Sequence, residues 1–264
     1  MKGGTGSLWR YLRIHPEIFM SEIKELDYFI LERNYSKGIR WYESNFNGQA
    51  KEYGEASPNY TKHPVHAGVP ERMHAVVPNA KLIYVVRDPI DRIISHYVHF
   101  YSNNKEDRTL SEALSDLDRS RYVTCSKYYM QLQQYLKYYP PESILIIASE
   151  SLKNQRRTTL KTIFSFLNVD DSFDSPEYDK VFHKSSLKRR RNKLGQLVLK
   201  MRWREKLRPH LPAAVVQMSR NMTGRHVAKP ELDKDLEKRL VDYLQEDVDS
   251  LRKYTGNDFK DWRL

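Results

Sequence analysis

A glycine-rich segment at the start of the chain has the residue types of a phosphate-binding loop. Residues Lys2–Ser7 read Lys-Gly-Gly-Thr-Gly-Ser and precede Leu8–Leu12, which has the pattern of a helix start. Glycines let successive backbone N–H groups converge on one anion, and a helix N-terminus and Lys2 add positive charge. The GxxxxGK[ST] spacing of the ordinary phosphate loop is absent, because the lysine precedes the glycines. Taken alone, the segment is equally consistent with a frayed terminus.

A second group suited to an anion follows an apolar run further along the chain. Residues Lys81–Val86 read KLIYVV and lead directly into Arg87, with Ser95 eight positions later. An arginine at the carboxyl end of a parallel strand points into the crevice where α/β proteins bind ligands, and its planar fork suits two phosphate oxygens. Ser95 adds a hydroxyl from the following helix. The competing interpretation is that Arg87 pairs with Asp88 or Asp91 and only ties the strand to the helix.

The elements that must hold these residues follow from apolar patterning. Lys81–Val86 and Ser143–Ala148 are short β-branched runs without alternation, which is typical of strands buried on both faces of a parallel sheet. Between them, residues from about 89 to 139 have helical spacing. Strand, helical crossover and strand is the βαβ pattern, so the predicted fold class is α/β. Amphipathic helices are also expected over 158–167 and 232–254, and a mobile basic loop over 183–193.

Composition limits the class of protein. The 264 residues contain 45 Lys and Arg against 34 Asp and Glu, and this formal charge of +11 indicates an anionic partner. The hydrophobic fraction of 39% is too high for a disordered chain. One cysteine, Cys125, excludes an internal disulfide framework and a four-cysteine zinc site. No apolar run is long enough to cross a bilayer or form a signal-peptide core, so we expect a soluble cytoplasmic protein with one domain, residues 1–264.

Several ordered motifs together resemble the sulfotransferases that use 3′-phosphoadenosine 5′-phosphosulfate (PAPS). In chain order they are KGGTGSLWRYLRIHPEI, KELDYF, NYSKGIRWYESNF, EASPNY, KLIYVVRDPIDRIISHY, GRHVAKPELD and LRKYTGNDFKDW. The resemblance covers nearly the whole chain and is nearest to heparan sulfate sulfotransferases and their bacterial relatives. It implies a P-loop-like three-layer fold, with a central parallel sheet flanked by helices. It also implies transfer of a sulfuryl group from PAPS to a hydroxyl or amine.

The resemblance further implies which residues bind PAPS and its product 3′,5′-ADP. The glycine-rich segment would bind the 5′-phosphosulfate, and Lys2 would stabilise charge on the bridging oxygen as the sulfuryl group leaves. Arg87 and Ser95 would bind the 3′-phosphate, and a Gly-Arg pair near the C-terminus would close on the cofactor. No metal is required. The residues expected to bind cofactor are Lys2, Gly3, Gly4, Thr5, Gly6, Ser7, Arg87, Ser95, Gly224 and Arg225.

By the same resemblance, Glu25 of KELDYF is the general base. A carboxylate within hydrogen-bond reach of the acceptor takes its proton, while nucleophile and leaving oxygen lie in line across sulfur. Asp27 is a nearby competitor for this role and His63 a weaker one. The competing interpretation of Glu25 is a surface carboxylate paired with Lys24. Contacts with the acceptor, a carbohydrate or a small molecule, are expected from Tyr28, Tyr60, Lys62 and His63.

Two departures from the family pattern carry expectations of their own. Ala56 stands where the family usually has a lysine, which weakens the case for a heparan-like acceptor. Family members also have a hydrophobic strand before the glycine loop. Only Met1 stands there, so the central sheet is expected to lack one strand. The basic run 188–191 is interpreted either as a lid over the cofactor, as a contact with an acidic acceptor, or as a solvated loop.

Two other classes of function remain open on the sequence. A phosphate-loop nucleotide kinase would also bind a nucleotide, but its GK[ST] motif and an acidic metal ligand at a strand end are not found. A non-enzymatic polyanion-binding protein would explain the charge, but not the paired phosphate motifs at strand–helix junctions. Nucleic acid is therefore not the expected partner. The acceptor stays open, because fold and cofactor do not fix it.

Overall fold

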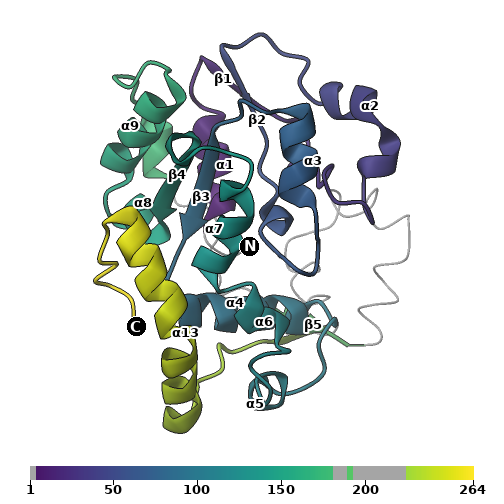
Figure 1. Cartoon of the computed structure of the whole chain (residues 1–264), viewed down its shortest axis with the longest axis vertical. Helices are drawn as coiled ribbons and strands as arrows, with labels where there is room; N and C mark the ends of the chain where they lie inside the picture. Colours follow the sequence, from purple (N-terminus) through teal and green to yellow (C-terminus); the bar gives the residue numbers. More distant parts are fainter. Residues whose placement is uncertain (1–3, 181–188, 193–223) are drawn as a thin grey trace, which may run out of the picture.

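The computed structural model describes residues 4–180, 189–192 and 224–264. Three pairs of strands and a set of mostly short helices make up this part of the chain (Figure 1). The strands are β1 (Ile18–Met20), β2 (Glu52–Gly54), β3 (Leu82–Val86), β4 (Ile144–Ala148), β5 (Arg189–Arg191) and β6 (Gly224–His226). The α-helices are α1 (Thr5–Leu12), α2 (Ile39–Glu43), α3 (Val69–Val76), α4 (Pro89–Ser102), α5 (Leu110–Ala113), α6 (Arg121–Thr124), α7 (Tyr128–Leu136), α8 (Ser149–Asn154), α9 (Arg156–Leu167) and α13 (Lys234–Thr255). Single 3₁₀ turns are η1 (Tyr35–Lys37), η2 (Pro58–Tyr60), η3 (Pro141–Ser143) and η4 (Pro176–Asp179).

The centre of the fold is the parallel pair β3 and β4, joined by a crossover that contains α4 to α7 (Figure 1). The register pairs Leu82 with Ile144 and Val86 with Ala148, so both strands end at the same edge. Parallel strands require such a crossover, because a tight turn cannot return the chain to the starting edge. The predicted α/β class is confirmed, and each strand begins one residue later than the sequence pattern indicated.

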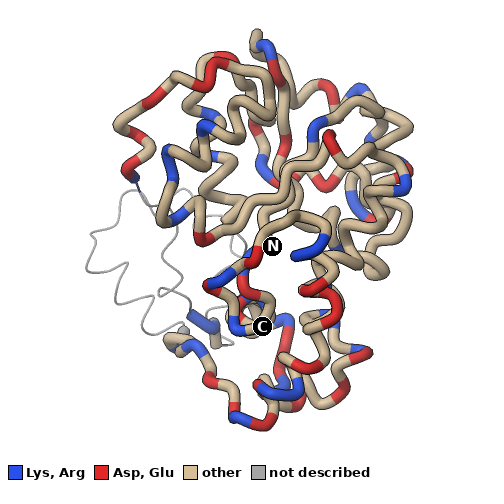
Figure 2. The backbone as a smooth tube through the Cα atoms, turned by 60° about the vertical axis from the view of Figure 1, so that its left-hand side comes forward, with Lys and Arg blue, Asp and Glu red and all other residues tan. Residues whose placement is uncertain are grey.

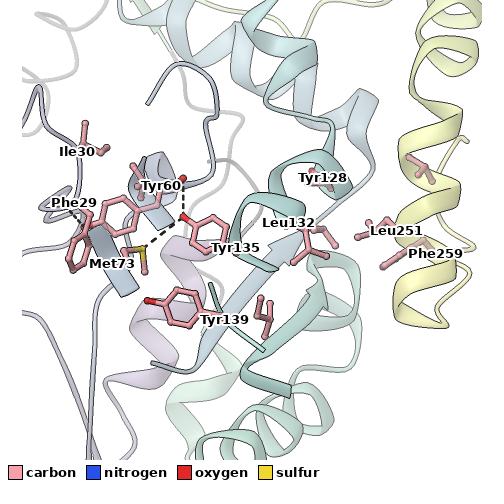
Figure 3. Close-up of a cluster of buried hydrophobic side chains, with 14 of the residues drawn as sticks. Phe29, Ile30, Tyr60, Met73, Tyr128, Leu132, Tyr135, Tyr139, Leu251 and Phe259 are labelled. Carbon is pink, nitrogen blue, oxygen red and sulfur yellow. Dashed lines mark hydrogen bonds between the residues drawn. The ribbon is translucent and has the colours of Figure 1, made fainter. Parts of the chain in front are cut away.

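Helices cover both faces of this pair, which makes it the middle of three layers. Side chains alternate between the two faces along a strand. Tyr84 and Val86 belong to the cluster formed with α7 and α13, whereas Ile83 and Val85 belong to the cluster formed with α1 and α9. Figure 3 shows the first cluster, with Leu132 of α7 beside Leu251 of α13. Burial on both faces explains why the strands are apolar without alternation.

The C-terminal helix α13 follows its predicted pattern closely. Its start is capped by Asp233, whose side chain accepts a hydrogen bond of 2.8 Å from the backbone N–H of Leu236. Its end is at Gly256, which has φ of 67°, a left-handed conformation that favours glycine. Among the described helices, none has the length and apolar character needed to cross a membrane. The predicted apolar stripe is buried throughout: Leu236, Leu240, Leu244, Val248 and Leu251.

The prediction of a basic loop was wrong for residues 189–191, which form strand β5. This strand pairs antiparallel with β6, with Arg190 opposite Arg225. The guanidinium of Arg190 lies 4.0 Å from the ring centroid of Tyr101 and forms an ion pair with Asp107, so it is anchored to the end of α4. The pairing partner lies more than thirty positions away, which leaves no local pattern in the sequence. Residues 183–188 and 193 lie outside the described residues.

A cavity of about 430 Å³ lies between the sheet of β1 and β2 and the sheet of β3 and β4. Ile18 and Met20 of β1 line it, together with the four consecutive residues 82–85 of β3. Since consecutive side chains point to opposite faces, the cavity must reach the edge of β3 rather than one face. Among the described strands, β3 pairs only with β4 and β1 only with β2. The cavity therefore lies beside strand edges that have no partner among the described strands, and the expected absence of one strand stays a prediction.

A strand-forming apolar segment fused before Met1 should fill this space and raise the stability of the protein. It would bury apolar surface and pair with an open edge, and a gain of about 1 kcal/mol raises the melting temperature of a chain this size by about 2–4 °C. Thermal unfolding by circular dichroism is the measurement, with a Gly/Ser extension of equal length as control. Equal melting temperatures for the two extended proteins would contradict the prediction.

Candidate active site

The glycine-rich segment ends against the carboxyl edge of the central sheet. Gly4 precedes α1 with φ of 91°, a conformation that glycine adopts without strain. Its carbonyl accepts hydrogen bonds from the N–H groups of Ser7 (2.9 Å) and Leu8 (3.1 Å), which starts the helix. A Cβ on Gly4 would lie 3.7 Å from Ser149 and 4.0 Å from Val85. The first turn of α1, with Thr5, Gly6 and Ser7, therefore begins beside the ends of β3 and β4. Lys2 and Gly3 lie outside the described residues.

The second predicted anion group is assembled at the end of β3. Arg87 follows the last strand residue, and its Nη1 donates a hydrogen bond of 3.2 Å to Oγ of Ser95 on α4. Its Nη2 forms an ion pair of 2.6 Å with Asp91. Arg87 therefore forms the ion pair with Asp91 that the competing interpretation expects, and it also contacts Ser95. Its binding of an anion stays a prediction. Asp88 instead caps α4, since its Oδ1 accepts a hydrogen bond of 2.7 Å from the N–H of Asp91.

Two further cations meet the same carboxylate. Lys229 lies 2.9 Å and Arg263 lies 2.7 Å from Oδ1 of Asp91. Burial raises the pKa of Asp91, but Lys229, Arg87 and Arg263 outweigh burial and lower it overall. Three segments far apart in the sequence therefore bring positive charge to the start of α4. Elsewhere along the described backbone, Lys and Arg are interspersed with Asp and Glu (Figure 2).

The Gly-Arg pair lies in strand β6, a few residues before Lys229. Arg225 pairs across the ribbon with Arg190, and the chain then continues to Lys229 and its ion pair with Asp91. The segment that begins at Gly224 therefore returns to the start of α4.

The segment that carries the predicted base has an unusual backbone. Glu25 has φ of 64° and Asp27 has φ of 48°, left-handed conformations that cost non-glycine residues about 1–3 kcal/mol each. The side chain of Glu25 is 42% exposed and pairs with Lys24. Asp27 is only 3% exposed, accepts hydrogen bonds from Asn59 at 2.9 and 3.1 Å, and pairs with Arg33. Of the two carboxylates, Glu25 is the accessible one.

The four residues expected to contact the acceptor are mostly inside the protein. Tyr28, Tyr60 and Lys62 are each less than a tenth exposed. Tyr28 stacks on Tyr42 with ring centroids 4.7 Å apart, and burial lowers the pKa of Lys62. The backbone of His63 is held by the Gln131 amide, which accepts from its N–H at 2.8 Å and donates to its carbonyl at 2.7 Å. This burial is typical of side chains that support a site from inside the protein rather than of side chains on its surface.

A buried carboxylate that the sequence analysis did not select as a site residue lies next to Tyr60. Glu55 accepts hydrogen bonds from the hydroxyls of Ser57 (2.7 Å), Tyr60 (2.8 Å) and Tyr42 (3.3 Å). Burial raises the pKa of Glu55 to about 7, although the three hydroxyl donors lower it in part. No local signal distinguishes Glu55, because Tyr42 lies thirteen positions away and its hydroxyl could not be assigned a partner from spacing.

Taken together, the described geometry is that of a P-loop-like α/β protein, with a glycine-led helix start and an arginine at one edge of a parallel sheet. Residues 1–252 match the family model described as "Sulfotransferase domain". The chain therefore belongs to the sulfotransferase domain family.

Relatives and a solved structure give further similarities. The chain is 28% identical over 180 residues to mouse heparan sulfate glucosamine 3-O-sulfotransferase 5, covering 64% of this chain and 51% of that protein. It is 27% identical over 270 residues to human heparan sulfate glucosamine 3-O-sulfotransferase 3B1, covering 98% of this chain and 62% of that protein. The chain thus spans about half to three fifths of these relatives. A sulfotransferase crystal structure from Alicyclobacillus acidocaldarius shares the fold, with TM-score 0.70 and 21% identity, over 100% of this chain and 95% of the other.

The raised pKa of Glu55 predicts a specific pH dependence of stability. Between about pH 4.5 and pH 7 the folded protein retains a proton on Glu55 that the unfolded chain has lost, so the free energy of unfolding falls as pH rises. The change is at most about 3 kcal/mol. Glu55→Gln should remove it. Urea unfolding at pH 5 and pH 8 measures the difference, with Glu52→Gln as control. An identical pH dependence in wild type and Glu55→Gln would contradict the assignment.

Proposed function

We propose that the protein is a PAPS-dependent sulfotransferase. The observation that carries the proposal is that the two groups predicted to bind anions meet at one end of β3. Gly4 and the start of α1 lie against Val85, and Arg87 with Ser95 follows Val86. A nucleotide with phosphate groups at both its 5′ and 3′ positions matches two such groups better than a nucleotide with a single phosphate chain. Membership of the sulfotransferase domain family supports the same reaction.

The proposed reaction is an in-line displacement at sulfur. The acceptor oxygen or nitrogen forms a bond to sulfur as the bond from sulfur to the 5′-phosphate oxygen breaks, which releases 3′,5′-ADP. Glu25 takes the proton that the acceptor loses, and its exposed side chain is suited to reach a bound acceptor. Lys2, with the N–H groups at the start of α1, would stabilise the charge that develops on the leaving oxygen. The displacement needs no metal, and positioning supplies much of the rate.

The acceptor is proposed only as a class, a carbohydrate or small molecule with a reactive hydroxyl or amine. The relatives named above act on heparan sulfate glucosamine by their names, which favours a sugar hydroxyl. Ala56 removes a positive charge that the family usually has beside the acceptor, which favours a less anionic sugar than heparan. A panel of glycans, lipids and small alcohols incubated with PAPS, with release of 3′,5′-ADP as readout, would identify it.

Arg87→Ala should weaken the binding of 3′,5′-ADP. Loss of a hydrogen bond to a charged group costs about 1.5–3 kcal/mol, which is roughly 10- to 150-fold in the dissociation constant. Isothermal titration calorimetry measures the constant. Arg119→Ala is the control, since the Arg119 side chain is 91% exposed and lies outside the site. Binding of adenosine 5′-phosphosulfate, which has no 3′-phosphate, should not change. Equal affinity for 3′,5′-ADP in wild type and Arg87→Ala would remove Arg87 from the site.

Glu25→Gln should lower turnover about 10²- to 10⁴-fold without loss of cofactor binding. The amide keeps the shape of the side chain but cannot take a proton, and a general base contributes about 10²- to 10⁴-fold to the rate. Release of 3′,5′-ADP gives the rate, and calorimetry with 3′,5′-ADP gives the affinity. The neighbouring exposed Glu22→Gln is the matched control. Turnover by Glu25→Gln at the wild-type rate would move the base to another residue.

A further inference from the structure

Glu55 is connected through two hydroxyl groups to residues 24–29, here called the base segment, which carry Glu25. Its Oε2 accepts from the hydroxyl of Ser57 at 2.7 Å, and its Oε1 accepts from the hydroxyl of Tyr60 at 2.8 Å. Each of these hydroxyls in turn accepts a backbone N–H. The N–H of Asp27 donates to Ser57 at 3.0 Å, and the N–H of Phe29 donates to Tyr60 at 3.4 Å. Two relays therefore run from one carboxylate to alternate residues of the base segment.

The base segment requires such support. Its left-handed residues, Glu25 and Asp27, have side chains that raise the energy of this conformation, so the surrounding contacts must compensate. The Asp27 side chain is held by Asn59, which lies in the same turn η2 as Tyr60. The backbone N–H groups of Asp27 and Phe29 donate to the hydroxyls of Ser57 and Tyr60. The carbonyls of the same segment are held separately, that of Leu26 by Asn34 and that of Phe29 by Arg72.

Tyr60 is itself fixed from a second direction. The hydroxyl of Tyr135 on α7 donates a hydrogen bond of 3.0 Å to the carbonyl of Tyr60, as Figure 3 shows. Tyr60 is 8% exposed, so its ring has little freedom to move. The position of its hydroxyl is therefore determined by packing, and the remaining variable is the direction in which the hydroxyl hydrogen points.

A carboxylate determines that direction. An ionised carboxylate only accepts hydrogen bonds, whereas a hydroxyl both donates and accepts. Above about pH 7, where Glu55 is ionised, Ser57 and Tyr60 direct their hydrogens at the carboxylate and turn their lone pairs to the two N–H groups. An amide at the same position presents one donor and one acceptor, so at least one hydroxyl can reverse its direction. The charge also strengthens both relays, since hydrogen bonds to an ionised group are the stronger ones.

We propose that Glu55 is a positioning residue, which holds the turn that carries Glu25 by orienting the hydroxyls of Ser57 and Tyr60. Glu55 is not assigned a reaction step, because both of its oxygens are occupied by hydroxyl donors. The consequence for catalysis rests on the proposed role of Glu25. The consequence for the backbone of the turn does not.

The test is amide hydrogen exchange resolved by NMR at Asp27 and Phe29, carried out at pH 8, above the pKa of about 7 of Glu55. Ser57→Ala should accelerate exchange at Asp27 only, and Tyr60→Phe at Phe29 only. Glu55→Gln should accelerate both by at least about tenfold, although it removes neither acceptor. Glu52→Gln, with the same charge change three residues away, should alter neither. Wild-type protection of both amides in folded Glu55→Gln would overturn the proposal, and unchanged exchange in the core strand β3 shows that the variant is folded.

A kinetic measurement separates positioning from general destabilisation. With any acceptor that wild type uses, Glu55→Gln should lower kcat about tenfold while the affinity for 3′,5′-ADP stays unchanged. A parallel loss of cofactor affinity would indicate a general structural effect and count against the proposal. The failure of the proposed function has a different signature, since wild type would then neither bind 3′,5′-ADP nor release it from PAPS. The exchange experiment tests the hydrogen bonds that link Glu55 to the base segment whether or not the proposed function is correct.

Discussion

The parallel pairing of β3 with β4 is the constraint on which the site depends. Because the two strands run in the same direction and Val86 pairs with Ala148, the chain leaves both strands at one edge. Arg87 and α4 begin there after β3, and α8 begins there after β4. Gly4 and α1 close against the same edge. A strand pair buried on both faces thus converts segments far apart in the sequence into one shared surface.

The sequence was informative where the determining interactions are local or repetitive. Both central strands could be predicted because burial on two faces requires continuous apolar residues, and α13 because its buried positions recur with the helical period. The proximity of Arg87 to Ser95 follows from strand-to-helix geometry over only eight residues. In each case the physical cause and the pattern occupy the same short stretch of chain.

The sequence was uninformative where partners are distant. Strand β5 depends on β6, and like charges at Arg190 and Arg225 gave no hint that the two segments pair. The anchoring of Arg190 on Tyr101 supplies the missing attraction. Glu55 could not be recognised for a similar reason, since its burial depends on how η2 packs beneath the base segment. The excess charge also could not be located by pattern. Lys2 and the stretches 181–188 and 193–223 hold ten Lys and Arg against one acidic residue, nine of the eleven excess charges.

The carboxylate of Asp91 has a consequence for the protein without ligand. Three cations gathered around one small volume repel one another, and this repulsion favours separation of their segments. Asp91 contacts Arg87, Lys229 and Arg263 and holds them together in the protein without ligand. The nucleotide proposed above would meet side chains whose ordering cost has already been met, which is the advantage of preorganisation. The same carboxylate would repel that anion, so Asp91 would lower the binding strength while it keeps the three cations together.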